Sequence, residues 1–193
     1  NFNIIIYYMF MELVKIFKQS QILRYGLYIL IGSILLIISA KIKIPFYPVP
    51  MTMQTFVVLF LGILLGPILG TSTVILYLFE GLLGLPVFSN SPEKGVGLVY
   101  FTGPTMGYLI GFIFASFFAG KIHYKDGYLI ILTKLIFAVS IIYILGIIWL
   151  GNLIGWDKPI FEYGAKPFLL AELFKILLLL LISKGLLKIK SII

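Results

Sequence analysis

Two oppositely charged residues, Glu172 and Lys175, stand directly before a long apolar run in the stretch AELFKILLLLLISKG, residues 171–185. In a helix, side chains three positions apart lie on one face. A charge inside a membrane helix costs about 3 kcal/mol on insertion scales, so such residues indicate function. Lys175 can pair with a ligand carboxylate, and Glu172 can accept N–H bonds from a urea-like or amide group. The structural alternative is an i,i+3 ion pair that keeps the lysine charged.

Other polar and aromatic residues stand near the ends of apolar runs, where a small ligand can be held. Tyr77 and Glu80 are one helical turn apart, and Glu80 can equally neutralise a lysine or cap the backbone. Thr52, Gln54 and Thr55 follow the proline-rich stretch IPFYPVP, which is an extended segment that lines a cavity or serves as a rigid connector. The remaining candidates are Asn90, Tyr100 and Tyr108, although tyrosines often belong to an interfacial aromatic belt.

The usual constellations of catalysis are missing from the sequence. It has one histidine, His123, no cysteine, no HExxH, no GxSxG and no GxxxxGK[ST]. No close pair of acids suggests general acid–base chemistry. We therefore predict a protein that is not an enzyme, that holds no metal or cofactor and that does not bind ATP through a P-loop.

The composition predicts that the chain lies in a bilayer. It has 193 residues, of which 61% are hydrophobic and 11% are charged, whereas a soluble domain has about 25% charged residues. The net charge of +8 is scattered singly at the ends of apolar runs. That pattern is typical of positive-inside anchors, and it argues against nucleic-acid binding, which needs a clustered basic face.

Six apolar segments predict an all-α integral membrane protein with six transmembrane helices. They form a single domain over residues 22–190, and residues 1–21 are interpreted as an interfacial helix or a disordered segment. Glycine and proline mark the joins between the segments. The six segments are 22–40, 53–65, 68–83, 105–119, 129–150 and 168–187.

The distribution of lysine and arginine predicts the orientation in the cell membrane. With the N-terminus inside, the cytoplasmic side carries Lys15, Lys18, Arg24, Lys121, Lys125, Lys184, Lys188 and Lys190. The outer side carries the smaller set Lys41, Lys43, Lys94, Lys158 and Lys166. This bias favours cytoplasmic placement of both termini. The long loops 41–52, 86–103 and 151–167 then lie outside, on the side of Lys175.

A ladder of small residues recurs every four positions in the fourth segment. It consists of Gly103, Gly107, Gly111, Ala115 and Ala119, and such ladders let helices approach closely. The ladder predicts either packing within the chain or a docking surface for a partner subunit.

Several stretches resemble the BioY family, whose members are the biotin-binding membrane subunits (S components) of energy-coupling factor (ECF) transporters. The resemblance covers residues 44–175, with its motifs in the expected order. The matching stretches are IPFYPVPMTMQT, LGILLGPILG, YLFEGLLGLPVF, GLVYFTGPTMGYLIGF, YILGIIWL and KPFLLAELFK.

The resemblance implies a six-helix S-component fold, with biotin held near the outer face by Glu172 and Lys175. The family usually has Gly-Asp where this chain has Ala171-Glu172, so the carboxylate is kept one methylene longer. The resemblance also implies a transmembrane coupling subunit and two ATPases as partners. It places their docking face on the first helix, where Gly32 and Ser33 are our candidates.

Two alternatives stay open. One is the same fold with another small vitamin as its ligand. The other is a non-transporting membrane scaffold packed through its glycine ladders.

Overall fold

The structure is a computed structural model, and it describes residues 6, 20–44, 47–49 and 51–191. The segment 1–21 therefore lies almost entirely outside the described residues. The long helices are α2 (Gln21–Lys41), α3 (Gln54–Leu82), α5 (Met106–Gly120), α6 (Tyr128–Ile154) and α8 (Leu169–Lys190). The short elements are β1 (Lys43–Ile44), β2 (Met51–Thr52), α4 (Leu98–Phe101), α7 (Ile160–Gly164) and the 3-10 turn η1 (Lys166–Phe168).

The prediction of a helical membrane protein is confirmed. Among the described residues, α2, α3 and α6 are long and apolar enough to cross a membrane, and α5 is a shorter apolar helix. The sixth predicted segment forms α8, which carries Glu172 and Lys175 in its N-terminal half. The protein is therefore a multi-pass membrane protein.

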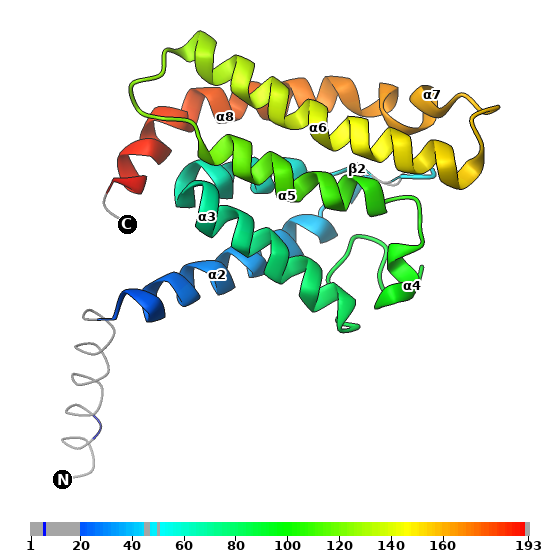
Figure 1. The fold of residues 1–193 in the computed structure, drawn as a ribbon, viewed down its shortest axis with the longest axis horizontal. Coiled ribbons are helices and arrows are strands. Elements are labelled where there is room, and N and C mark those ends of the chain that lie inside the picture. The colour runs from blue at the N-terminus through cyan, green and yellow to red at the C-terminus, as the bar shows by residue number, and fades with distance from the viewer. Residues whose placement is uncertain (1–5, 7–19, 45–46, 50, 192–193) are drawn as a thin grey trace.

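The second and third predicted segments form one element, α3, which folds back on itself. At Gly66 the backbone leaves the helical region, with φ 83° and ψ 178°, and Pro67 follows. A Cβ placed on Gly70 would lie 2.9 Å from the Cα of Gly62, so the two halves touch beside the bend. Figure 1 shows α3 reversing its direction at the end of the molecule nearer the C-terminus. The two segments predicted from the sequence are thus the two arms of a helical hairpin.

The helices pack in a continuous series around this hairpin. α3 packs chiefly against α5 and α2, α5 packs against α6, and α8 packs against α3. Figure 1 shows α6 and α8 on one side of α5, and α2 on the other. The core is almost entirely aliphatic and aromatic, and its fully buried members include Leu59, Ile63, Tyr77 and Leu135.

The ladder of small residues on α5 packs against the chain's own helices. A Cβ on Gly107 would lie 2.5 Å from the Cβ of Trp149, and one on Gly111 would lie 2.7 Å from the Cα of Ile142. Gly103 accepts a hydrogen bond from the Trp149 indole through its carbonyl oxygen, at 2.9 Å. These contacts favour internal packing of α5 against α6 over the docking of a partner there.

Gly32 and Ser33 on α2 also face inward. A Cβ on Gly32 would lie 2.6 Å from the Cγ2 of Thr73, and Ser33 donates a hydrogen bond to Glu80. Both residues therefore join α2 to α3 and leave no free side-chain surface for a partner.

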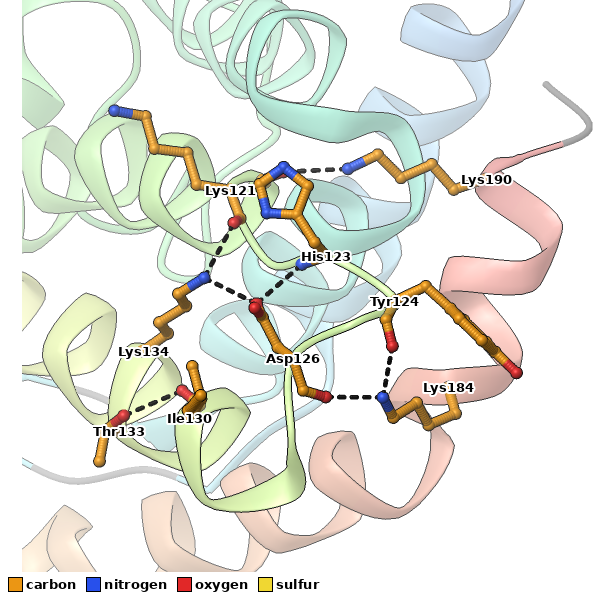
Figure 2. Close-up of polar contacts among 10 residues, drawn as sticks. Lys121, His123, Tyr124, Asp126, Ile130, Thr133, Lys134, Lys184 and Lys190 are labelled. Carbon is orange, nitrogen blue, oxygen red and sulfur yellow. Dashed lines mark hydrogen bonds and ion pairs between the residues drawn. The ribbon is translucent and has the colours of Figure 1, made fainter.

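A cluster of lysines ties together the end of the molecule where α5 turns into α6 (Figure 2). Lys184 donates to the carbonyl oxygens of Tyr124, at 2.5 Å, and Asp126, at 2.6 Å. Lys190 donates to the carbonyl of Gly120 at 3.0 Å, and Lys134 pairs with the Asp126 carboxylate at 2.6 Å. The second half of α8 is therefore fixed to the α5–α6 turn, far from Glu172.

Candidate functional site

A cavity of about 50 Å³ lies where α3, α5, α6 and α8 meet β2 and the loop before α4. Its walls combine aromatic rings with a few polar groups, which is the usual make-up of a small-molecule site. The aromatic lining residues are Phe88, Tyr100, Tyr108, Phe112, Tyr143 and Phe168. The polar lining residues are Thr52, Gln54, Thr55, Ser89, Thr105 and Glu172.

Glu172 and Lys175 form a buried ion pair beside this cavity. They are 4% and 7% exposed, and the Nζ of Lys175 lies 2.7 Å from the Oε1 of Glu172. The same Oε1 accepts a 2.8 Å hydrogen bond from the Thr55 hydroxyl. The second oxygen, Oε2, is buried and has no hydrogen-bond partner of normal geometry among the described residues, and the Tyr143 hydroxyl interacts with the same carboxylate. The pair thus leaves one carboxylate oxygen unused at a residue that lines the cavity.

Local structure explains where the pair sits. Pro167 lies in η1, which leads directly into α8. Glu172 therefore falls in the first turn of α8, where the partial positive charge of a helix N-terminus favours a carboxylate. On the facing side β2 ends at Thr52 and α3 begins at Gln54. Thr52, Gln54 and Thr55, which follow the proline-rich stretch in the sequence, therefore lie in the cavity wall.

Gln54 is held in the cavity wall by Tyr77. The Gln54 side-chain amide donates to the Tyr77 hydroxyl at 2.7 Å, and that hydroxyl donates to the Val87 carbonyl at 3.3 Å. Tyr77 is fully buried and is not among the residues that line the cavity, so its contact with the cavity is through Gln54.

Tyr100 and Tyr108 both present their rings to the cavity. Tyr100 stacks on Phe88, with ring centroids 4.5 Å apart, and Phe88 meets Tyr77 edge-on at 5.4 Å. The Tyr108 hydroxyl donates to the carbonyl of Gly164 in α7 at 2.8 Å. Both tyrosines are thus part of the core around the cavity rather than an outer aromatic belt.

Glu80 and Asn90 lie away from this cavity. Glu80 accepts the hydrogen bond from Ser33 and joins α3 to α2. Asn90 lines a smaller hollow with Lys94, and Tyr100 and Thr105 border both spaces. The side-chain oxygen of Asn90 accepts a hydrogen bond from Lys43 at 3.2 Å.

Two lysines that sequence reasoning treated only as membrane anchors hold the loop over the cavity. Lys41 donates to the carbonyls of Phe88, at 2.8 Å, and Ser91, at 3.0 Å. Lys43 donates to the carbonyl of Ser89 at 2.6 Å. Lys41 is the last residue of α2 and Lys43 is the first residue of β1, so no periodicity in the sequence signalled this role.

Tyr143 is one of several lining residues that the sequence analysis did not predict. It lies mid-way along α6 in an apolar run, adjoins Glu172 in the cavity wall, and its ring centroid is 6.0 Å from that of Tyr108. A single tyrosine among isoleucines and leucines carries no periodic signal that would separate a binding role from ordinary packing.

The arrangement suits a small, uncharged ring with N–H donors. The ion pair is neutral as a unit, Glu172 offers an acceptor, and the aromatic rings offer flat apolar surface. Within the described part of the chain, no three His, Cys, Asp or Glu side chains gather where a metal ion could bind.

Comparisons with known proteins give consistent matches to one family. The BioY family model matches residues 12–191. A probable biotin transporter BioY from Pyrococcus horikoshii is 34% identical, with 82% of this chain and 90% of that protein covered. The biotin transporter BioY from Thermotoga maritima is also 34% identical, covering 89% and 98%. A crystal structure of the S-component for biotin from an ECF-type ABC transporter superposes with a TM-score of 0.74, at 28% identity, covering 88% of this chain and 94% of the other. This chain belongs to the BioY family.

Proposed function

We propose that this protein is the membrane subunit that captures biotin for import. The observation that carries the proposal is the unused Oε2 of the buried Glu172 at the edge of an aromatic cavity. The ureido ring of biotin has two N–H donors, and a carboxylate oxygen buried without a donor is costly until one arrives. The names of the family relatives point to the same ligand.

In this proposal the ring of biotin lies between the aromatic side chains, with an N–H group directed at Glu172. Gln54, Tyr100 and Tyr108 line the same space and complete the contact surface. Tyr77 and Lys175 support these residues from behind, and Asn90 lies towards the outer hollow. Glu80 acts at a distance, through the packing of α2 on α3.

Ligand entry requires movement of the cavity walls. Small-molecule sites hold about 300–1,000 Å³, whereas this cavity holds about 50 Å³. Lys41 at the end of α2 and Lys43 in β1 hold the loop before α4 by a few hydrogen bonds. We expect this loop to separate from both lysines when biotin enters.

Energy for import comes from other chains in this proposal. The sequence has no P-loop, and the structurally similar S-component belongs to an ECF-type ABC transporter. A transmembrane coupling subunit and two ATPases are therefore the expected partners. The chain would lie in the cytoplasmic membrane with both termini inside, as its lysine distribution indicates.

Equilibrium binding of labelled biotin to the detergent-purified protein tests the proposal. We expect saturable binding that Glu172→Gln weakens by about tenfold or more, the scale of a hydrogen bond to a charged group. Glu162→Gln is the matched control, because Glu162 is half-exposed and pairs only with Lys166. Absence of binding to the folded wild type would refute biotin as the ligand, and other vitamins should then be screened. Absence of binding by any of them would favour a scaffold.

A further inference from the structure

The α5–α6 turn and the C-terminal part of α8 carry more positive charge than their own acid can neutralise. Asp126 is the one acid within residues 121–134 and 184–190, and Lys134 pairs with it at 2.6 Å. Two further lysines donate to main-chain carbonyl oxygens, a contact that leaves their charges in place. The other three lysines are exposed and have no carboxylate partner among the described residues. They are Lys121, Lys125 and Lys188.

The opposite end of the molecule is closer to neutral. The three long loops there hold five lysines and three acids. Lys43 lies 3.8 Å from Glu93, and Lys166 lies 2.7 Å from Glu162. The surplus of positive charge therefore belongs to one end. A partner attracted by that charge must be anionic and must lie on that side of the membrane.

Apolar surface adjoins the lysines of the α5–α6 end. Tyr124, Tyr128 and Leu129 are all more than half exposed. The Lys184 ammonium lies 5.1 Å from the ring centroid of Tyr124 and 5.7 Å from that of Tyr128. Tyrosines beside lysines are typical of the level of lipid headgroups. Leu129 and the half-exposed Ile130 continue this surface along the start of α6, so a lipid can reach it directly.

Lys121 lies on the other side of the turn from Lys184 (Figure 2). Its ammonium is 4.4 Å from the ring centroid of Phe117, in the last turns of the apolar helix α5. A cation over an aromatic ring is a weak contact at an exposed site. The charge of Lys121 therefore stays available to a phosphate group at the edge of the bilayer.

We propose that this surface, the basic rim, binds the headgroups of anionic phospholipids. The exposed ammonium groups contact the lipid phosphates, and the acyl chains lie along the start of α6. A cluster of about 4–8 lysines next to a membrane segment is the usual footprint for such lipids. Lipid fits better than an acidic protein, because the lysines adjoin side chains that face the bilayer. The basic rim consists of Lys121, Lys125 and Lys188 with Tyr124 and Tyr128.

Titration of the detergent-purified protein with phosphatidylglycerol and with phosphatidylcholine of the same acyl chains tests the proposal. Native mass spectrometry counts the lipid bound at each concentration. We expect the wild type to bind phosphatidylglycerol at least about tenfold more tightly than phosphatidylcholine. Lys121→Gln/Lys125→Gln should weaken phosphatidylglycerol about 10- to 30-fold, the scale of two lysines at an anionic surface, and should leave phosphatidylcholine unchanged. Equal affinity of the wild type for the two lipids would overturn the proposal.

The matched control is Lys94→Gln/Lys158→Gln, which removes two exposed lysines from the opposite end. It should bind phosphatidylglycerol as the wild type does, and an equal loss in both double variants would show an effect of net charge alone and overturn the basic rim. Glycerol phosphate, the headgroup without chains, should not compete. Full competition by it would assign the surface to a soluble anion instead of a lipid.

Salt provides a second measurement on the wild type, which does not depend on the folding of any variant. Raising the salt concentration screens exposed charges. It should weaken phosphatidylglycerol and leave phosphatidylcholine nearly unchanged. Binding of phosphatidylglycerol that is indifferent to salt would overturn the proposal. None of these measurements involves biotin, so the inference stands or falls separately from the proposed function.

Discussion

Phe88 is the buried aromatic side chain that packs the loop before α4 onto the rest of the protein. It is 1% exposed, it lies between Tyr77 and Tyr100, and its ring covers Gly81 so closely that any Cβ there would overlap it. The glycine at position 81 therefore lets the ring reach the cavity wall.

Gly81→Ala should displace Phe88 and weaken both the fold and ligand binding. Forcing a methyl group into packed aromatic rings costs about 1–3 kcal/mol, which thermal unfolding of the purified protein would detect. The matched control is Gly26→Ala, since a Cβ at Gly26 meets nothing within 4 Å. Equal stability of the two variants would contradict the close packing of Phe88 on Gly81.

For single residues, the sequence was enough to predict the charged pair but not its hydrogen-bond partners on other elements. The three-residue spacing of Glu172 and Lys175 was enough to predict a shared helix face, and the structure confirms their ion pair. The acceptors from Thr52 and Thr55 could not be predicted, because they come from about 120 residues away. Tyr143 gave no signal, since one tyrosine in an apolar helix looks the same whether it faces a cavity or a neighbouring side chain.

The α3 hairpin is the element that sets the geometry of the first half of the protein. Its bend at Gly66 rests against the C-terminal end of α5, where a Cβ on Gly120 would lie 2.5 Å from the Cα of Pro67. Backbone atoms cannot move aside as a flexible side chain can, so this contact needs glycine.

Gly120→Ala should therefore destabilise the protein by about 1–3 kcal/mol, measured by thermal unfolding. Gly185→Ala in α8 is the matched control, because a Cβ at that position has no neighbour within 4 Å. If Gly120→Ala unfolds at the wild-type temperature, the bend does not pack on α5 in the way described.

The α5–α6 turn should make stability depend on acidic pH. Partial burial by itself acts to raise the pKa of Asp126. Hydrogen bonds from the His123 backbone and the Lys134 ammonium, with the charge of Lys134, outweigh it and lower the pKa below its ordinary value of 3.8. A carboxyl with a lowered folded-state pKa stabilises the fold above its unfolded-state pKa and loses that contribution as pH falls through the folded-state pKa.

We therefore expect Asp126→Asn to unfold at a lower temperature than the wild type near pH 7, and the difference to disappear when both are measured well below pH 3.8. Asp157→Asn serves as the control, an exposed aspartate in another loop. A difference that stays the same across this range would show that the charge of Asp126 is not what stabilises the turn.

The positions of the helices could be predicted from the sequence, but the way in which the helices join and pack could not. The six apolar segments were identified from hydropathy and from the glycine and proline at their joins. The short join GPILG did not by itself predict that the second and third segments form one hairpin. The hairpin depends on the positive φ of Gly66, which only the structure shows. The spacing of the small residues predicted close approach correctly. Which helices approach depends on the whole packing arrangement, because Gly107 and Gly111 meet α6 whereas Ala119 meets Gly62 of α3.

The whole molecule has two unlike ends. Figure 1 shows α4 and α7 at one end and the turn between α5 and α6 at the other, where Figure 2 shows the lysines that bind the turn. The cavity lies towards the first end, because Tyr100 of α4 lines it. Exposed cations at the second end include Lys121, Lys125 and Lys188. By the positive-inside rule we expect that end to face the cytoplasm, and the proposed ligand cavity would then open to the outside.

Single-cysteine labelling in intact cells tests this orientation, and the chain suits it because it has no cysteine of its own. A membrane-impermeant thiol reagent should label Lys94→Cys, which is exposed in the loop near the cavity, and should spare Lys188→Cys, which is equally exposed at the opposite end. Both variants should be labelled once the cells are permeabilised, which shows that each thiol is accessible. The reverse pattern in intact cells would turn the cavity towards the cytoplasm, and a protein in that orientation could not capture biotin from outside. Removing one lysine from either end changes the charge bias little, so the variants should keep the wild-type orientation.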